Sequence, residues 1–434
     1  MVISSHYRLV NAHIPLCLLP SLRLSSQQVT NITKEGLICC DLEIKAGKII
    51  GIYPSESAPT DNLLRWDLKK GIVLPCFVDM HTHLDKGHIW ERTPNPDGTF
   101  NSALIAVGSD RSNNYSNSSY EDIYRRMEFG LKCSYAQGTK AIRTHIDCPS
   151  TQFDLSLQVF ADLQKEWRDR LTLQAVSLVT LEDYDGARGE ILADRIADLG
   201  GILGGVPYAN PHLEAQLDRL FNLASDRHLD LDLHTDENDD PNSHTLKATA
   251  EAALRHNFKG KIVCDHCCSL AVQSESEIKE TLALVKSAKI GIVSLPMCNL
   301  YLQDRQSMRT PRWRGVTLVH ELKQAGIPVA IASDNVRDPF FAFGNHDGLE
   351  VFSTAVRIAH LDTPYSDWIK VITTTPSELM GLESNFLGAG ASADLVVFKA
   401  RYFSELLSRP QSDRYVIRNG IAIDTTLPDY AELD

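Results

Sequence analysis

The chain has 434 residues, of which 43% are hydrophobic and 23% charged, and its formal net charge is -13. This length and composition allow a large globular core, and the acidic balance disfavours nucleic acid or an anionic membrane as the main partner. No apolar run approaches the roughly 20 residues that a membrane span needs. Ten scattered cysteines and the lack of a signal-peptide pattern favour a cytoplasmic protein with reduced thiols.

Both ends of the chain are predicted to form β-strands. Strand-like alternation of apolar and polar side chains recurs in four segments: residues 7–19, 37–55, 392–400 and 414–425. Gly47 marks a hairpin turn in the second segment, and Asn419-Gly420 marks another in the fourth. We therefore expect residues 1–70 and 381–434 to form one small β-sandwich-like domain.

Between these ends, short apolar strands alternate with helical patterns. Eight strand-like runs occur, at residues 71–81, 138–147, 171–180, 200–208, 229–236, 261–267, 289–296 and 327–334. Helical patterns separate most of them, at residues 119–137, 154–170, 212–227 and 274–288. Such alternation is typical of parallel strands with crossover helices, and eight repeats favour an α/β fold of the (β/α)8 TIM barrel type over residues 71–380. The alternative is an open doubly wound sheet. Residues 93–119 form a long polar stretch that is predicted to be an irregular loop.

Polar side chains collect where several of these strands end. His81 and His83 close the first strand, and residues i and i+2 of a strand share a face, so both imidazoles point the same way. His234 ends the fifth strand, His266 the sixth and Asp334 the eighth, at the face where TIM barrels carry their active sites. Singly, each has an ordinary explanation as a core histidine or a helix cap. Together they predict a metal site that suits Zn²⁺ and Fe²⁺ equally.

Several stretches resemble known enzymes. PCFVDMHTHLDKG, at residues 75–87, resembles the signature first strand of the amidohydrolase superfamily. Within that superfamily, three further stretches resemble bacterial cytosine deaminases: HTDENDD, MCNLYLQDR with TPRWRGVTLVHELKQAGIPV, and SDNVRDPFFAFGNHD. The last also resembles the ring-amine hydrolases of s-triazine breakdown. The resemblance covers nearly the whole chain.

The resemblance implies a metal-dependent hydrolytic deaminase of a cytosine-like N-heterocycle, in which metal-activated water attacks a ring amidine carbon and ammonia leaves. One divalent ion, Zn²⁺ or Fe²⁺, would be held by His81, His83, His234 and Asp334. Glu237 would move protons to the ring nitrogen and the leaving ammonia, and His266 would position the water. Asp334 would also take the water's proton. Binuclear relatives usually bridge two metals with a lysine, and the fourth strand has none.

Two departures from the cytosine deaminase pattern bear on the substrate. Val179 and Thr180 stand where those enzymes have Pro-Gln, whose amide reads the pyrimidine edge. Asn335 replaces an acidic residue that often follows the last-strand carboxylate. Lys86 and His88 make the loop after the first strand more basic than a neutral pyrimidine needs. Lys86 is either solvated or contacts an anionic or carbonyl-rich ring.

Six residues are candidate substrate contacts: Thr180, Lys86, Asn335, Phe340, Asn299 and Gln303. Phe340 and its neighbour Phe341 could stack on a flat ring or simply pack under the following helix. An alternative activity is removal of an alkylamine from a triazine or pyrimidine ring, or opening of a cyclic amide. A non-catalytic scaffold is disfavoured, because every ligand position and Glu237 are present. The expected partner is a small heterocyclic molecule. Barrels of this family are often homo-oligomers, and the sequence leaves the number of copies open.

Overall fold

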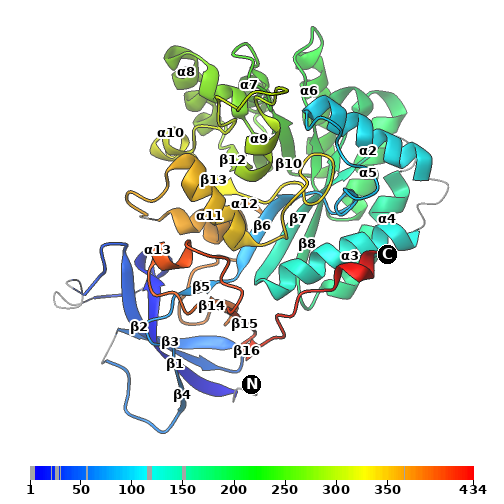
Figure 1. Cartoon of the computed structure of the whole chain (residues 1–434). Helices are drawn as coiled ribbons and strands as arrows, with labels where there is room; N and C mark the ends of the chain where they lie inside the picture. The colour runs from blue at the N-terminus through cyan, green and yellow to red at the C-terminus, as the bar shows by residue number, and fades with distance from the viewer. Residues whose placement is uncertain are drawn as a thin grey trace. The chain divides into compact units, whose positions relative to one another are not determined.

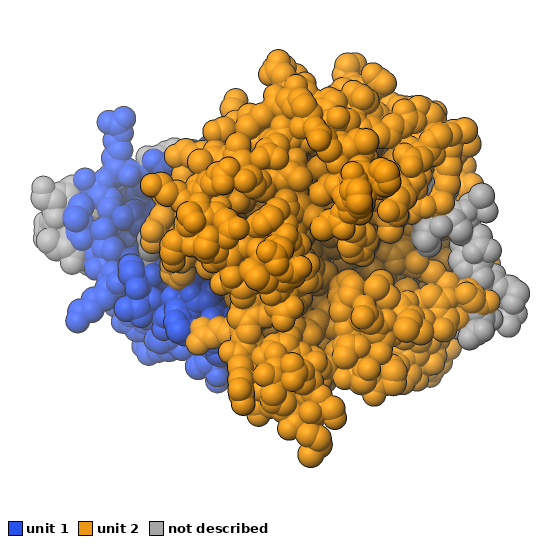
Figure 2. All heavy atoms as spheres, turned by 90° about the horizontal axis from the view of Figure 1, so that it is seen from above, with its two compact units in different colours: residues 1–78, 132–140, 347–428 blue, residues 79–131, 141–346, 429–434 orange. Residues whose placement is uncertain are grey.

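The structure is a computed structural model that describes residues 5–434 except 21, 25–28, 30, 55–56, 115–119, 149–152 and 366. The chain divides into two compact units (Figure 2). Unit 1 comprises residues 1–78, 132–140 and 347–428, and unit 2 comprises residues 79–131, 141–346 and 429–434. Among the described residues, none of the helices combines the length and the apolar character that a membrane span requires.

Unit 1 is built mainly from the two ends of the chain, as Figure 1 shows. One sheet has the order β3-β2-β1-β4, with β1 His6–Pro15, β2 Leu37–Lys45, β3 Lys48–Pro54 and β4 Leu64–Asp67. The other has the order β16-β15-β14-β5, with β5 Val73–Pro75, β14 Leu395–Val397, β15 Tyr415–Arg418 and β16 Ile421–Ala422. Side chains of both sheets, such as Leu42 and Leu395, belong to one buried apolar core.

Both predicted hairpins of unit 1 are confirmed. The β2–β3 turn holds Ala46 and Gly47 at φ 48° and 77°, and the β15–β16 turn holds Asn419 and Gly420 at φ 48° and 74°. Two successive residues with positive φ match the twist of antiparallel strands, which is why Asn-Gly is so strong a turn signal. The boundaries 1–70, 381–434 and 71–380 stay a prediction.

The eight strands predicted for the centre of the chain are confirmed, except that the first, predicted over residues 71–81, is divided: Val73–Pro75 forms β5 in a sheet of unit 1, and β6 begins at Phe77. They are β6 Phe77–Thr82, β7 Thr139–Asp147, β8 Thr172–Leu178, β9 Leu203–Gly205, β10 Leu231–Thr235, β11 Ile262–His266, β12 Gly291–Ser294 and β13 Val329–Ile331. They form two sheets, β6-β7-β8 and β9-β10-β11-β12-β13. The pairs β7–β8 and β9 to β13 are parallel, so the carboxyl ends of these strands meet at one edge.

Isolated parallel bridges join the two sheets at both of their edges. Val176 of β8 pairs with Ile202, directly before β9. Thr82 at the end of β6 pairs with Asp334, which follows β13. The strands therefore succeed one another in chain order, and the last is linked back to the first.

Helices connect and cover these strands (Figure 1). In unit 2 and at its border they are α2 Phe100–Asn114, α3 Tyr120–Ala136, α4 Phe153–Trp167, α5 Gly186–Asp198, α6 Leu213–Arg227, α7 Thr245–Arg255, α8 Glu275–Ser287, α9 Pro296–Leu302 and α10 Val319–Gln324, with short 3-10 turns η2 Leu181–Tyr184, η3 Cys268–Val272 and η5 Tyr430–Leu433. Unit 1 carries α11 Gly348–Ala359, α12 Thr374–Leu379, α13 Phe403–Leu406, η1 Leu16–Leu18 and η4 Trp368–Ile372. The four predicted helices are confirmed as α3, α4, α6 and α8.

The prediction of an irregular loop over residues 93–119 holds for residues 93–99 but was wrong for residues 100–114. Residues 100–114 form α2, and residues 115–119 lie outside the described part of the chain. The segment contains Gly108 and many Ser and Asn residues, which have low helix propensity. Two of its apolar residues, Leu104 and Ile105, remain exposed, so the helix lacks the single apolar stripe by which amphipathic helices are usually detected.

Candidate metal centre and active-site cavity

The end of β6 is held against the segment that follows β13. The Asp334 amide donates to the His81 carbonyl at 2.9 Å, and the Thr82 hydroxyl donates to the Asp334 carbonyl at 2.9 Å. This pairing brings the side chains together, because His81 Nε2 and His83 Nε2 lie 3.4 Å and 3.1 Å from Asp334 Oδ1. Asp334 itself has φ 64°, a left-handed conformation that is uncommon for a residue other than glycine.

His234 of β10 joins this group from the other sheet. Its ring centroid lies 4.7 Å from that of His81 and 5.6 Å from that of His83. All four residues predicted to bind a metal are therefore neighbours, and all are buried. They come from β6, β10 and the end of β13, as expected of strands whose carboxyl ends share an edge.

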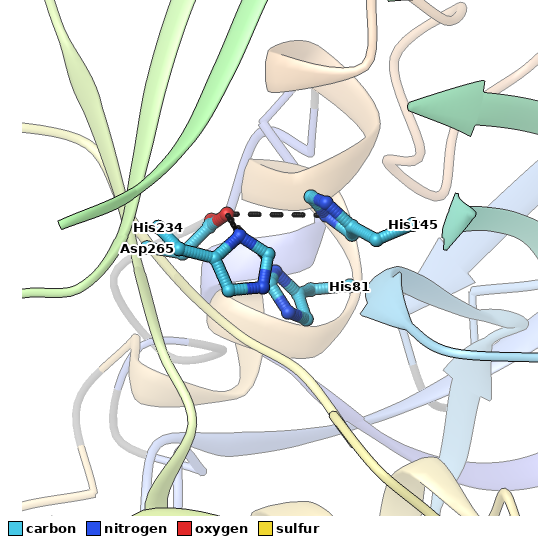
Figure 3. A group of neighbouring side chains, drawn as sticks. All are labelled: His81, His145, His234 and Asp265. Carbon is cyan, nitrogen blue, oxygen red and sulfur yellow. Dashed lines mark ion pairs between the residues drawn. The ribbon is translucent and has the colours of Figure 1, made fainter. Parts of the chain in front are cut away.

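Two further residues, which the sequence reasoning did not select, belong to the same cluster. His145 of β7 and Asp265 of β11 approach His81 and His234, and Figure 3 shows the three imidazoles around the Asp265 carboxylate. Asp265 Oδ2 lies 3.0 Å from His81 Nδ1, 3.8 Å from His234 Nδ1 and 3.9 Å from His145 Nε2.

A sequence signal for His145 did exist. On β7, Arg143, His145 and Asp147 alternate at spacing two, as His81 and His83 do on β6, so all three share one face of the strand. Polar residues at this spacing in an otherwise apolar strand indicate a polar interior. His145 lies two residues before the end of β7, and so outside the group of strand-terminal residues from which the metal site was predicted.

The cluster fits a cation. Within the described part of the chain, both ring nitrogens of His145 and His234 and both carboxylate oxygens of Asp334 are buried without a hydrogen-bond partner. A buried polar group without a partner costs about 1–3 kcal/mol, so several together are expected only where another species satisfies them. Imidazole nitrogens and carboxylate oxygens are donors that Zn²⁺ and Fe²⁺ accept.

The protonation behaviour of the cluster indicates the same need for positive charge. Burial opposes a charged His81, but the carboxylates of Asp265 and Asp334 outweigh it and raise the pKa of His81 to about 10. Burial also opposes a charged Asp334, yet its contacts with His81 and His83 hold the pKa of Asp334 well below its usual range. Two carboxylates therefore stabilise a cation at this point, whether a proton or a metal ion.

Glu237 and His266 border the same site. Glu237 follows β10, and its Oε1 lies 3.3 Å from His266 Nδ1. The Asn299 amide nitrogen donates to Glu237 Oε1 at 3.1 Å and lies 3.0 Å from His266 Nδ1. Gln303 donates to the Glu237 backbone carbonyl at 3.2 Å. Burial, and then the charge of Asp334, raise the pKa of Glu237 well above its usual range.

A cavity of about 830 Å³ opens onto these residues. It is lined by nine of the twelve predicted site residues: His83, Lys86, Thr180, His234, Glu237, His266, Asp334, Asn335 and Phe340. His81 lies behind this lining. Asn299 and Gln303 are also not part of it and contact Glu237 instead, so their role as substrate contacts stays a prediction.

Lys86 is buried and lines the cavity, so the solvated alternative is wrong. Its ammonium lies 3.2 Å from Asp147 Oδ1 and 5.0 Å from the centre of the Phe340 ring. Arg111 of α2 contacts the same Asp147 carboxylate. The expectation of a basic His88 was also wrong, because burial lowers the pKa of His88 to about 2 and the ring faces His346.

Helix α2 supplies a wall of the cavity that the sequence reasoning did not foresee. One face of it contributes Phe100, Leu104, Val107, Gly108, Arg111 and Ser112. The opposite segments, after β8 and β9, contribute Val179, Val206, Pro207 and Tyr208. The cavity therefore combines a polar end near the histidines with largely apolar walls, which is typical of sites that bind small organic molecules.

A family model described as "Amidohydrolase family" matches residues 129–427 of this chain. The chain belongs to the amidohydrolase family. As a member of this family it is 51% identical to the pterin deaminase of Rhizobium rhizogenes strain K84 over 407 residues, which cover 93% of this chain and 92% of the relative. It is 26% identical to N-isopropylammelide isopropyl amidohydrolase of Pseudomonas sp. strain ADP, covering 83% of this chain and 87% of that one.

Solved amidohydrolase-like structures share the fold. The 5-methylcytosine deaminase of Klebsiella pneumoniae with bound 5-fluorocytosine superposes with a TM-score of 0.81 at 24% identity, covering 98% of both chains. The atrazine chlorohydrolase TrzN of Arthrobacter aurescens TC1, complexed with zinc, superposes with a TM-score of 0.65 at 17% identity, covering 98% of both chains. The predicted membership of the amidohydrolase superfamily is confirmed.

Proposed function

We propose that this chain is a metal-dependent hydrolytic deaminase that acts on a pterin-like ring and releases ammonia. The observation that carries the proposal is the 51% identity to a pterin deaminase along almost the full length of both chains. The group of Glu237, His266 and Asp334 at one end of a cavity supplies chemistry that suits this reaction. A pterin also suits the absence of the pyrimidine-reading Gln, where Thr180 stands instead, and a cavity near the upper end of the ~300–1,000 Å³ usual for ligand pockets.

The fold that we propose for this reaction is a closed (β/α)8 barrel with a small β-sandwich domain. The bridges from Val176 to Ile202 and from Thr82 to Asp334 support closure of the eight strands. The shared core of the two four-stranded sheets supports the sandwich. We propose residues 71–380 as the barrel and residues 1–70 and 381–434 as the sandwich-like domain.

The residues proposed to hold one divalent ion, Zn²⁺ or Fe²⁺, are His81, His83, His234 and Asp334. Such an ion supplies Lewis acidity that activates water at neutral pH. Burial raises the pKa of Glu237 well above its usual range, which favours the protonated form that a general acid needs. Asn299 holds Glu237 Oε1 at 3.1 Å, and so fixes the direction from which the proton is delivered.

In the proposed reaction, water adds to the ring carbon that bears the amino group, and the bond from that carbon to the amino nitrogen breaks. Glu237 protonates the adjacent ring nitrogen as the water adds, and then takes the proton of the added hydroxyl and passes it to the leaving nitrogen, which departs as ammonia. The ring carbon keeps the oxygen as a carbonyl. His266 and Asp334 line the part of the cavity through which the ring carbon would reach the histidine cluster. Asp334 accepts the proton that the water loses, and this proton then returns to Glu237.

An assay of released ammonia, and of released isopropylamine for N-isopropylammelide, tests the proposal with metal-loaded protein. Pterin, cytosine, isocytosine and N-isopropylammelide are compared, with Glu237→Gln as the inactive control. We expect the largest kcat/KM for pterin. Faster release of isopropylamine from N-isopropylammelide would instead support the alkylamine activity. Turnover of none of these rings by zinc- or iron-loaded protein would contradict the proposal.

A further inference from the structure

We propose that Asp265 is a positioning residue that accepts the Nδ1–H of His81 and thereby directs His81 Nε2 toward His83 and Asp334. The inference rests on the metal site proposed above, and extends it to a carboxylate that lies behind the ligands. It concerns how this chain holds one imidazole in the correct tautomer.

The two nitrogens of the His81 ring face different carboxylates. Nδ1 lies 3.0 Å from Asp265 Oδ2, and Nε2 lies 3.4 Å from Asp334 Oδ1. Among the described residues neither nitrogen makes a hydrogen bond of normal geometry, so these two carboxylates are the nearest groups that the ring can engage. A neutral imidazole has one donor nitrogen and one acceptor nitrogen. A proton on Nδ1 satisfies Asp265 and leaves the Nε2 lone pair free for a cation, whereas the other tautomer would point a proton at the proposed ligand position. The side chains of His81 and Asp265 are fully buried, so water does not take over the role of the carboxylate.

On the side of the His81 ring away from Asp334, Asp265 is the carboxylate that faces His81 Nδ1. The nearby Asp232 of β10 is engaged by Arg143, whose guanidinium donates to it at 2.6 Å. His145 Nε2 lies 3.8 Å from Asp232 and 3.9 Å from Asp265, so neither carboxylate is close to His145, whereas Asp265 lies 3.0 Å from His81 Nδ1. The ring of His145 packs on that of His81, with centroids 4.0 Å apart and planes inclined by 32°, which restrains the plane in which His81 can turn.

A second possibility is that Asp265 binds an ion of its own, together with His81, His145 and His234, whose ligand atoms lie within 4.8 Å of one another. The cavity argues for the positioning role. His83, His234 and Asp334 line it, whereas Asp265 and His145 do not, so an ion that enters through the cavity reaches the Nε2 side of His81 first. Carboxylates that accept the second N–H of a metal-binding histidine are a general means of fixing its tautomer.

The test measures zinc affinity and stoichiometry by competition with a chromophoric chelator. Asp265→Asn and Asp265→Ala are expected to weaken zinc binding by about 10–100-fold, with alanine the weaker, while one zinc per chain is retained. The matched control is Asp338→Asn, because Asp338 is equally buried but contacts the Asn335 amide and backbone amides, with no imidazole. Its zinc affinity is expected to stay close to that of the wild type.

The outcomes separate the two proposals. Folded Asp265 variants whose zinc affinity is within about threefold of the wild-type value would overturn the positioning role. It would also be overturned if the wild type bound two zinc ions per chain and the variants only one. Wild-type protein that binds no zinc or iron would instead overturn the metal site itself. Should the variants not fold, ¹⁵N NMR of histidine-labelled, zinc-loaded wild type, with His81 assigned through His81→Gln, gives the answer. Protonation at Nδ1 supports the proposal, and protonation at Nε2 overturns it.

Discussion

The side-chain amide of Asn299 donates to the Glu237 carboxylate at 3.1 Å. Asn299 lies on α9, and Glu237 follows β10, so the contact joins two segments that are 62 residues apart in the chain. The Asn299 amide nitrogen is also 3.0 Å from His266, which places it between the proposed acid and its neighbour. Asn299 therefore fixes the direction of the Glu237 carboxyl in the proposed mechanism.

The first prediction concerns this contact. Glu237→Gln should lower kcat for the true substrate by about 10²–10⁴-fold, the usual contribution of a general acid. Asn299→Ala keeps Glu237 but removes the hydrogen bond that orients its carboxyl group. It should lower kcat by about 10-fold, the size of one such hydrogen bond, with little change in KM. Steady-state ammonia release measures both. Equal activities of wild type and Glu237→Gln would remove Glu237 from the mechanism.

The second prediction concerns metal binding. His83→Asn removes a nitrogen that lies 3.1 Å from Asp334. The variant should lose metal on purification and should gain no thermal stability from added zinc. The wild type should gain about 2.7 kcal/mol when zinc is present at 100 times its Kd, because only the folded protein binds it. Elemental analysis and melting curves provide the two readouts, and a His83→Asn protein that still melts higher with zinc contradicts this assignment.

The third prediction concerns Lys86, whose ammonium faces the cavity beside Phe340. Lys86→Met should raise KM for the preferred ring about 10-fold, the effect of losing one charge-assisted hydrogen bond, and should leave kcat nearly unchanged. Asp147 keeps Arg111 as a partner in this variant, so no buried charge is left alone. Lys399→Met, a change of the same kind at an exposed site, is the control. An unchanged KM in Lys86→Met would contradict a contact between Lys86 and the substrate.

The fourth prediction concerns the pH dependence of stability. In unit 1, Glu43 accepts a hydrogen bond from Arg8 at 2.8 Å, and this contact, with that of His6, lowers the pKa of Glu43. A lowered pKa means that the folded state favours the charged form. The stabilisation is therefore fully present above the usual glutamate pKa of about 4.3 and is lost as the pH falls through the lowered value.

Glu43→Gln should accordingly cost about 1–3 kcal/mol of unfolding free energy at pH 7. The difference between wild type and variant should shrink as the pH falls below about 4.3. Denaturant unfolding at a series of pH values measures it. A difference that grows toward low pH would show that the carboxylate is not stabilised by its neighbours.

Much of the fold could be predicted because its signals are local. Apolar runs of strand length and helical spacing were enough to locate β6 to β13, and Asn419-Gly420 located a hairpin whose backbone angles require such residues. Helix α2 escaped because its polar and apolar residues do not separate into two faces, and packing at the cavity compensates for its low propensity.

The site was predictable as far as residue types at strand ends reveal it. His81, His83, His234 and Asp334 do lie together. Asp265 was not predicted as a site residue, because in a regular strand it points away from the face to which its neighbour His266 was assigned. His266 has φ 64°, which breaks this alternation and lets both residues reach the histidine cluster. The direction of the Asn299 side chain depends on packing between distant segments, which a sequence motif does not encode.

Helix α2 also has a consequence for how such an enzyme diversifies. Six of its residues line the cavity, yet none of them belongs to the groups gathered around His81. Apart from Arg111, which pairs with Asp147, its lining residues can therefore change, or be exchanged for those of a relative, while the reactive centre is kept. Exchange of this one helix is therefore a short route by which a descendant of this protein acquires a different ring substrate.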